Sequence, residues 1–349
     1  MQPAILRFIR NHRRMLFAGV LSVCCAACGS SREHTRPDNN TPTHMADNVP
    51  AANGQDSGGV DTPADRPADA MPDGAQFPQE VTDVGFKTPE SVYYDASSDT
   101  YLVSNVNGSP TAKDNNGFIS KVSPSGEILD LNWISATTPN ITLNAPKGMA
   151  ISKGFLYVAD IDVVHIFDAA SGAFKGKINI PNATFLNDIA ADADDTIYVS
   201  DTGWRTGPNG FENTGTDAVW RIKNGTANRL VEGEILKNPN GLLVSHNEVL
   251  MVNGAGTLFT IGKDGDILNT TTLPAGGLDG IVETRNGSIL ISSWAAKAVF
   301  AGTPHDGFKP IVEDVSSPAD IGYDSKRHRL LIPIFEGDAI RIVPLSLEI

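Results

Sequence analysis

The chain has 349 residues, of which 40% are hydrophobic and 19% are charged, so it can bury a large core. It has 27 basic and 41 acidic residues, which gives a net charge of −14 at pH 7. Because an acidic surface repels phosphate backbones, nucleic acid is excluded as an expected partner, whereas a bound divalent cation would be favoured.

The N-terminus is typical of an export signal. A basic stretch, residues 7–14, holds four arginines and precedes an apolar run, residues 15–27. The run is too short to span a bilayer comfortably, which favours a signal peptide over a membrane helix. All three cysteines of the chain lie within residues 24–28, so we expect no disulfide and no thiolate chemistry beyond them.

The end of the apolar run resembles the lipobox of bacterial lipoproteins, in which small residues precede the cysteine that receives lipid. The sequence AACGS places Cys28 at that point, although Cys25 stands where leucine is usual. We therefore predict a lipoprotein signal peptide over residues 1–28 and lipidation of Cys28. The expected location is the bacterial cell envelope, on an outer-membrane lipid anchor, facing the periplasm or the surface; an unmodified secretory peptide is the alternative.

Residues 29–75 contain no Phe, Trp or Tyr and are rich in Pro, Asp, Ala and Gly. Such a segment cannot bury enough apolar surface to offset the conformational entropy lost on folding. We predict a disordered linker over residues 29–75 that tethers a folded domain over residues 76–349.

Beyond the linker, a pattern recurs six times: a turn residue, a short strand, a polar turn and a second apolar strand. The repeat starts are PESV (89–92), PKGM (146–149), LNDI (186–189), PNGL (239–242), LDGI (278–281) and PADI (318–321). Their spacing, 39 to 57 residues, agrees with four-stranded propeller blades. The second strands, such as TIYVSD and SILISS, alternate with period two. The sequence therefore predicts an all-β, six-bladed β-propeller.

Two further features support this fold. No segment longer than about ten residues shows helical periodicity, which excludes α/β architectures. A β-sandwich is the alternative, but it does not explain six matched starts. The last repeat ends near residue 345 without a fourth strand, and residues 80–86 form a spare strand before the first repeat. Their pairing would close the ring and remove two open sheet edges.

One residue opens the first strand of each repeat, and we call these six the ring positions: Glu90, Lys147, Asn187, Asn240, Asp279 and Ala319. Because innermost strands line a propeller's axis, we expect them to converge at one mouth of its central channel. Two carboxylates and two amides offer the hard oxygen ligands that calcium prefers, with waters completing the shell. Without a cation, Glu90 and Asp279 would repel and one would have to protonate.

The order Glu, Asn, Asn, Asp in repeats one, three, four and five resembles the calcium site of diisopropylfluorophosphatase and the paraoxonases. The propeller as a whole resembles the gluconolactonase, regucalcin and luciferin-regenerating family, most clearly in LNDIAADADDTIYVSD (186–201). The resemblance implies calcium bound by Glu90, Asn187, Asn240 and Asp279. It also implies hydrolysis of lactones, esters or phosphotriesters, with the metal as Lewis acid. Either a metal-bound water or Asp279 would be the nucleophile.

Lys147 departs from this pattern. Its ammonium group would either pair with Glu90 or Asp279 in a metal-free plug of salt bridges, or bind an anionic substrate group and stabilise a developing oxyanion. Under the hydrolase hypothesis, Asp279 and Lys147 are the expected catalytic residues.

The long connections between second and third strands, residues 105–116 and 202–216, are expected on the same face as the ring positions. They bring Asn105, Trp204 and Arg205 to the predicted substrate-binding region, where aromatic and basic groups suit a partly apolar, oxygen-rich small molecule. The alternative is that these are variable surface loops without a ligand.

The other polar residues of the repeats favour structural roles. His165 lies inside the strand VVHIF and is expected to be packed, while His246 and His328 fall in turns at the opposite face, so a histidine-driven mechanism is poorly supported. Asp188 and Asp320 each follow a ring position. We expect them to hydrogen-bond neighbouring strand starts rather than to hold a second cation.

Three functional hypotheses follow. The first is a calcium-dependent hydrolase of small lactones, esters or related electrophiles at the central channel. The second is a non-catalytic ligand- or protein-binding propeller, an NHL-like scaffold tethered to the cell envelope. The third, a strictosidine-synthase-like or sugar-oxidising propeller, needs a cofactor site that the sequence does not show. The sequence has no phosphate-binding glycine loop, zinc-type Cys/His spacing or serine nucleophile elbow.

Overall fold

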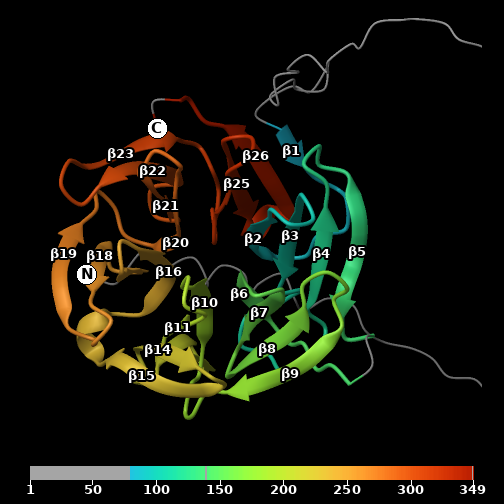
Figure 1. Ribbon diagram of the computed structural model, residues 1–349, viewed down its shortest axis with the longest axis horizontal. Helices are drawn as coiled ribbons and strands as arrows, with labels where there is room; N and C mark the ends of the chain where they lie inside the picture. Colours follow the sequence, from blue (N-terminus) through green and yellow to red (C-terminus); the bar gives the residue numbers. More distant parts are fainter. Residues whose placement is uncertain (1–78, 138–139, 348) are drawn as a thin grey trace, which may run out of the picture. The chain divides into compact units, whose positions relative to one another are not determined.

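Six four-stranded antiparallel sheets are arranged as blades around a common axis (Figure 1). The computed structural model describes residues 79–137, 140–347 and 349. The predicted signal peptide, Cys28 and the linker 29–75 lie outside these residues. Within them, helix is limited to two 3-10 turns, η1 (Glu234–Leu236) and η2 (Phe335–Gly337), and none is long and apolar enough to cross a membrane. The predicted all-β, six-bladed propeller is confirmed.

In blades 1 to 5 the strands follow chain order from the axis to the rim. Blade 1 consists of β2 (Pro89–Asp95), β3 (Thr100–Asn105), β4 (Phe118–Val122) and β5 (Ile128–Ser135). Blade 2 consists of β6 (Pro146–Ser152), β7 (Phe155–Asp160), β8 (Val163–Asp168) and β9 (Phe174–Asn179). Blade 3 consists of β10 (Leu186–Ala191), β11 (Ile197–Asp201), β14 (Ala218–Lys223) and β15 (Thr226–Glu232).

The second half of the ring repeats this order. Blade 4 consists of β16 (Pro239–Ser245), β17 (Glu248–Asn253), β18 (Thr257–Ile261) and β19 (Ile267–Thr272). Blade 5 consists of β20 (Leu278–Glu283), β21 (Ile289–Ser293), β22 (Ala298–Thr303) and β23 (Gly307–Val312). Blade 6 consists of β24 (Gly322–Asp324), β25 (Arg329–Ile334), β26 (Ala339–Pro344) and β1 (Gln79–Val81).

The core is divided into clusters of apolar side chains, one between each pair of neighbouring blades. Leu102 and Leu156 share the cluster between blades 1 and 2, and Val103 and Leu331 share the one between blades 6 and 1; all four are fully buried. This division follows from the period-two strands, because each sheet presents one apolar face to each neighbour. Every blade therefore depends on two others for its burial.

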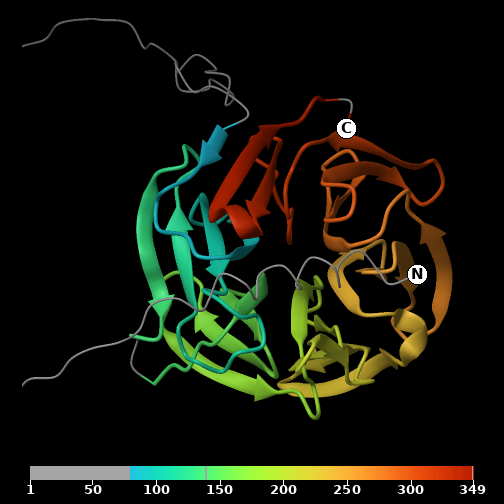
Figure 2. The ribbon, with the colours of Figure 1, turned by 180° about the vertical axis from the view of Figure 1, so that it is seen from behind.

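The ring is closed by strands from opposite ends of the domain. β1 pairs antiparallel with β26, Val81 opposite Ile340, and the two strands lie side by side in both views (Figure 1 and Figure 2). The predicted closure is confirmed, but the closing strand is shorter than residues 80–86. Asp83 and Gly85 have φ values of +57° and +103°, so the chain turns away after β1.

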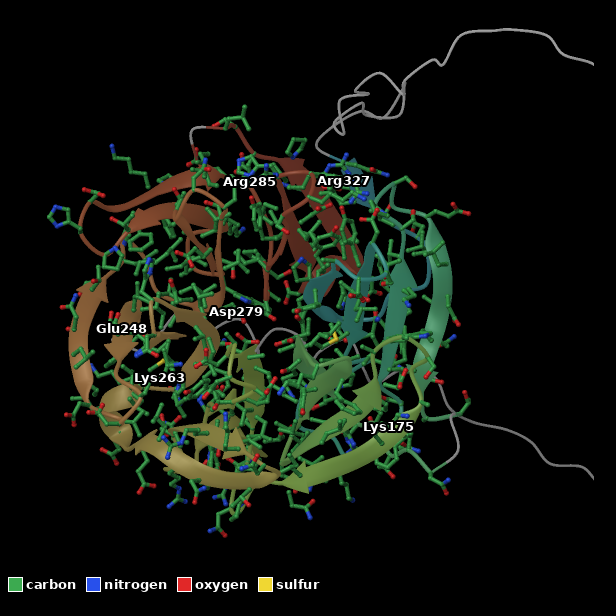
Figure 3. The ribbon with its side chains drawn as sticks, viewed as in Figure 1. Lys175, Glu248, Lys263, Asp279, Arg285 and Arg327 are labelled. Carbon is green, nitrogen blue, oxygen red and sulfur yellow. The ribbon has the colours of Figure 1, made fainter. Side chains whose placement is uncertain are left out.

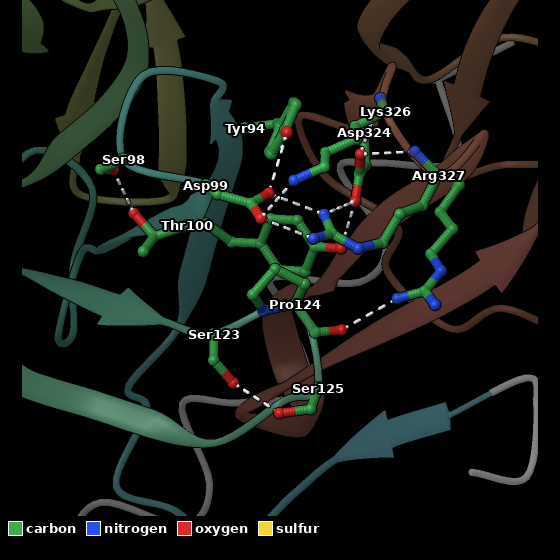
Figure 4. A network of polar contacts seen from close by, with 12 residues as sticks. Tyr94, Ser98, Asp99, Thr100, Ser123, Pro124, Ser125, Asp324, Lys326 and Arg327 are labelled. Atoms are coloured by element: carbon green, nitrogen blue, oxygen red, sulfur yellow. Dashed lines mark hydrogen bonds and ion pairs between the residues drawn. The ribbon is translucent and has the colours of Figure 1, made fainter. Parts of the chain in front are cut away.

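A polar network also joins blades 6 and 1 (Figure 4). Arg327 donates from Nη1 and Nη2 to both oxygens of Asp99, at 2.8 and 2.7 Å, and from Nη1 to Asp324 at 3.0 Å. Tyr101 of blade 1 donates to the same oxygen of the fully buried Asp324 at 2.7 Å. The hydrogen bonds from Arg327 hold the pKa of Asp99 well below its usual range. The network reinforces the junction that β1 closes.

We predict that Arg327→Met lowers the free energy of unfolding by about 1 to 3 kcal/mol, because a bidentate pair between blades is lost and the buried Asp324 loses a partner. Urea denaturation measures this loss. Lys175→Met is the matched control, since Lys175 pairs with Asp168 inside blade 2 at 3.3 Å and both are partly exposed. It should change stability by less than about 0.5 kcal/mol. Equal losses in the two variants would contradict a closing role for Arg327.

Candidate active site

The ring positions of blades 1 to 5 lie on irregularities of the inner strands. In each blade the register between the first and second strand shifts across the ring position, as between Pro89 and Ser91 or between Leu278 and Ile281. A β-bulge re-aims a side chain that regular pleating would direct into a sheet face. Figure 3 shows Asp279 on the inner side of its blade, with Lys175 at the rim.

In the odd-numbered blades, a serine of the second strand stabilises the bulge. Ser104, Ser200 and Ser292 each accept a hydrogen bond, at 2.8 to 3.0 Å, from the backbone N–H that follows the ring position. Sequence reasoning missed this role. The signal was present in the endings of the second strands, VSN, VSD and ISS, whereas the even-numbered blades lack a serine there.

The two acidic ring residues are buried and interact electrostatically. Glu90 and Asp279 are each 6% exposed. Burial, and then the charge of Asp279, raise the pKa of Glu90 well above its usual value, although Lys147 acts in the opposite direction. Burial raises the pKa of Asp279 to about 7, against the lowering effect of the Trp294 and Asn240 side chains. The two carboxyls therefore do not ionise together readily, as the sequence predicted.

Several oxygens at the ring positions lack partners. Among the described residues, four buried side-chain oxygens accept no hydrogen bond, and three belong to the predicted ligand set: Glu90 Oε2, Asn240 Oδ1 and Asp279 Oδ1. The fourth predicted ligand, Asn187, donates from Nδ2 to Thr202 Oγ1 at 3.0 Å. An unpartnered buried acceptor costs about 1 to 3 kcal/mol. Such a group of oxygens is what a hard cation would satisfy.

Lys147 is 1% exposed and is held by the segments that lead into blades 2 and 3. Its Nζ donates to Ala145 O at 3.0 Å and lies 4.5 Å from the centroid of the Phe185 ring. It takes part in none of the ion pairs within 4.0 Å in the described part of the chain, so the direct salt bridge of the plug hypothesis does not form. Burial lowers the pKa of Lys147, against the charges of Glu90 and Asp160.

Asp188 and Asp320 join neighbouring inner strands, as expected. Asp188 Oδ2 accepts the N–H of Leu242 at 2.6 Å, and Asp320 Oδ2 accepts the hydroxyl of Ser91 at 2.5 Å. Burial raises the pKa values of both, that of Asp188 to about 7. Gly148 allows this packing, since a Cβ there would lie 2.2 Å from Asp188 Oδ1. No three His, Cys, Asp or Glu side chains in the described residues lie close enough together to hold a metal ion. A cation at the ring positions would therefore also need the amide oxygens as ligands.

The Asn105 side chain is engaged inside blade 1, although its strand end pairs with Pro89 beside the ring residue Glu90. It is fully buried, accepts the N–H of Lys87 at 2.9 Å and donates to Val103 O and Ser120 Oγ within blade 1. The same strand-end position in blade 3 is Asp201, which accepts the N–H of Phe185 at 3.0 Å. The last residue of the second strand thus ties down the chain entering its blade, which is a structural role.

Trp204 and Arg205 lie on a hairpin within the long connection of blade 3, formed by β12 (Trp204–Gly207) and β13 (Gly210–Asn213). The Trp204 ring stacks on Phe211 at 5.3 Å, while Arg205 is exposed near Glu212. The hairpin borders a surface cavity of about 820 Å³, lined partly by Trp204, Phe211 and Asn238. None of the six ring residues lines it, so this cavity is adjacent to the candidate site but separate from it.

His165, His246 and His328 occupy the positions predicted for them. His165 is 3% exposed, lies beside Phe167 and Phe174, and its Nε2 is 3.2 Å from Asp160 Oδ2. His246 lies between β16 and β17, and His328 between β24 and β25, at the ends of the strands opposite to the ring positions. The packed role of His165 is confirmed.

Trp294 was missed by sequence reasoning. It follows β21, its Nε1 donates to Asp279 Oδ2 at 2.5 Å, and its ring lies 5.5 Å from that of Phe335. It therefore touches a predicted catalytic residue from the connection between second and third strands.

Comparisons with solved structures support the fold. A gluconolactonase from Xanthomonas campestris superposes with a TM-score of 0.56 at 19% identity, covering 75% of this chain and 87% of that one. The luciferin-regenerating enzyme superposes with a TM-score of 0.56 at 13% identity, covering 77% of this chain and 96% of that one. Virginiamycin B lyase from Staphylococcus aureus superposes with a TM-score of 0.54 at 14% identity, covering 77% of this chain and 99% of that one. No protein-family model matches the chain, and no curated protein matches it in sequence. At these identities the likeness shows the propeller fold alone.

We predict that chelator-treated protein loses stability as the pH rises from 5 to 8. The pKa values of Asp188 and Asp279 are raised to about 7, against about 3.9 in an unfolded chain. Between these values the folded state binds more protons at the two groups, so the stability that they contribute is full below about pH 4 and is lost as the pH rises through about 7. The urea midpoint at each pH measures this. Asp279→Asn should flatten the slope and Glu248→Gln should not. A urea midpoint that rises with pH in the chelator-treated wild-type protein would contradict the burial of these groups.

Proposed function

We propose that the chain is a calcium-dependent hydrolase of small lactones or esters, acting at the ring positions. The observation that supports this most strongly is the set of buried, unpartnered oxygens on Glu90, Asn240 and Asp279, which belong to three different blades. Buried acceptors in a protein core are normally hydrogen-bonded, so a purely structural role for these residues does not explain three acceptors without donors.

The donor set fits calcium. Glu90, Asn187, Asn240 and Asp279 would hold the ion through two carboxylate and two amide oxygens, and calcium takes flexible sets of oxygen ligands. When bound, calcium would act as a Lewis acid on the oxygen of the electrophile. Without it, burial raises the pKa values of Glu90 and Asp279, and the charge of Asp279 raises that of Glu90 further, so a positive ion would compensate both carboxyls.

Lys147 supplies the second positive charge at the ring. Its ammonium group is anchored on Ala145 O and on the Phe185 face, so it is held in place rather than free to fold onto Glu90. A fixed donor in a water-poor site stabilises negative charge that develops on a substrate oxygen. These contacts support a role for Lys147 at the oxyanion rather than in a salt bridge.

Water is the nucleophile that the contacts of Asp279 favour. Its Oδ2 accepts the indole N–H of Trp294, and its Oδ1 belongs to the proposed ligand set. Both oxygens are thus engaged, and an engaged carboxylate is better suited to holding a ligand or a proton than to attacking a carbonyl.

Apolar side chains pack near the ring positions. Val106, Ala145 and Ile161 form a buried cluster with Phe335, which lies beside Trp294. An apolar environment next to a cation and a few fixed polar groups suits a small neutral lactone or ester. Lactone hydrolysis is also the activity in the name of the Xanthomonas campestris neighbour. The lipid anchor predicted at Cys28 would hold such an enzyme at the cell envelope.

We expect Asp279→Ala to abolish calcium binding and to lower hydrolysis of lactone and aryl-ester substrates by more than about 100-fold, because it removes a calcium ligand. Loss of a residue that only supports a metal ligand already lowers metal affinity or activity by about 10- to 100-fold. Chelation of the wild-type protein should do the same, and added calcium should restore activity. Glu248→Ala, which removes a carboxylate at the opposite end of blade 4, should leave both properties unchanged.

The outcomes separate the hypotheses. Calcium-dependent turnover that Asp279→Ala abolishes supports the hydrolase. Bound calcium without turnover of any lactone or ester favours the binding propeller. Full retention of calcium and activity in Asp279→Ala would discard the assigned site.

A further inference from the structure

The residue that directly follows the second strand occupies an equivalent place in every blade, and we call these six the collar positions: Val106, Ile161, Thr202, Gly254, Trp294 and Phe335. In five blades the backbone N–H of the collar residue donates to the carbonyl two residues before the ring residue. The five bonds measure 2.8 to 3.4 Å and run from Val106 to Thr88, Thr202 to Phe185, Gly254 to Asn238, Trp294 to Gly277 and Phe335 to Ser317.

Blade 2 is the exception, and Lys147 explains it. The carbonyl two residues before this ring residue is that of Ala145, which accepts the Lys147 ammonium instead of a collar N–H. The repeated backbone bond therefore fixes each collar residue above the ring residue of its own blade, and in blade 2 the ring residue itself takes that bond.

The collar side chains fall into two kinds. Val106, Ile161 and Phe335 are apolar and share one cluster, and Gly254 has no side chain. Thr202 and Trp294 can form hydrogen bonds, and each bonds the ring residue of its own blade. The indole of Trp294 donates to Asp279 Oδ2 at 2.5 Å, and the hydroxyl of Thr202 accepts from Asn187 Nδ2 at 3.0 Å.

Local packing holds Trp294 in this position. Gly277 has a φ of +63°, and a Cβ there would lie 3.3 Å from Trp294 Cβ and 3.0 Å from the backbone nitrogen of Ala295. A side chain at this point would push the tryptophan loop away from the start of β20. On its other side the indole lies against Phe335.

The contacts of Trp294 and Thr202 each occupy one polar atom of a ring residue and leave its other polar atom free to face the ion. Trp294 can only donate, so it takes Oδ2 of Asp279, while Oδ1 accepts no hydrogen bond within 3.5 Å; the Asn240 side chain also lies close enough to lower the pKa of this carboxyl. Thr202 gives its own proton to Pro239 O at 2.6 Å, so it can only accept from the NH2 group of Asn187, which leaves the amide oxygen as the free end. Both bonds thus present an oxygen rather than a donor.

We propose that Thr202 and Trp294 are positioning residues that select which atoms of Asn187 and Asp279 face the ion. This inference rests on the proposed calcium site and goes beyond it, since neither residue belongs to the ligand set. Outer partners of this kind fix the orientation of ligands and raise metal affinity without touching the metal.

The test measures calcium affinity by titration calorimetry on the full-length protein. Trp294→Phe and Thr202→Val should weaken calcium binding about 10- to 100-fold, whereas Thr202→Ser, which keeps the hydroxyl, should stay within about threefold of wild type. Trp133→Phe is the control, because Trp133 lies on the outer strand β5 beside Lys121 and should change nothing. Circular dichroism and urea midpoints check that every variant folds.

Terbium emission gives a second readout, which reports whether the indole of Trp294 lies beside the bound ion. Terbium takes the same oxygen ligands and emits when a nearby indole is excited, so saturated wild type and Trp133→Phe should emit equally and Trp294→Phe should lose most of the signal. Wild-type calcium affinity in Trp294→Phe and Thr202→Val would overturn the inference while leaving the proposed site intact, as would Thr202→Ser binding as weakly as Thr202→Val. A wild-type protein that binds neither ion would overturn both proposals.

Discussion

The antiparallel pairing of β1 with β26 is the constraint on which the rest of the molecule depends. Each blade buries its two apolar faces against its neighbours, so an open ring would expose one face of blade 1 and one of blade 6. Three residues of β1 complete the sixth sheet, and the Arg327–Asp99 contact supports the same junction. Because the ring is closed, the inner strands cannot move apart independently. Side chains from separate blades are thereby held near one axis at little conformational cost.

The rigid ring allows the candidate site to keep buried groups that lower the stability of the fold. Glu90, Asp188, Asp279 and Asp320 are all buried, and burial raises the pKa value of each. Unpartnered oxygens add about 1 to 3 kcal/mol each. The apolar clusters between blades lie outside the axis and offset this cost, so unfavourable groups persist where the fold over-determines their positions. Buried carboxyls of this kind commonly mark functional sites.

Much of the fold could be predicted from the sequence, because six repeat starts and alternating strands are local patterns. The convergence of the ring positions is an expectation from the topology. The collar contacts could not be predicted, since Trp294 reaches Asp279 only through the turn at Gly277 and the packing of Phe335. Asn105 was expected at the mouth because it begins a long connection, yet its side chain points into blade 1 as a strand-end tie. The β12–β13 hairpin had a readable signal in the Pro-Asn-Gly turn at 208–210.

The proposed calcium site can be tested most directly by a crystal structure of the calcium-soaked protein, with an anomalous difference map collected near the calcium absorption edge. We expect one strong peak on the axis, about 2.3 to 2.6 Å from oxygens of Glu90, Asn187, Asn240 and Asp279. Lys147 should remain on Ala145. An axis without a peak, with the Lys147 ammonium turned onto Glu90 or Asp279, would contradict the central claim that oxygens from four blades share one cation.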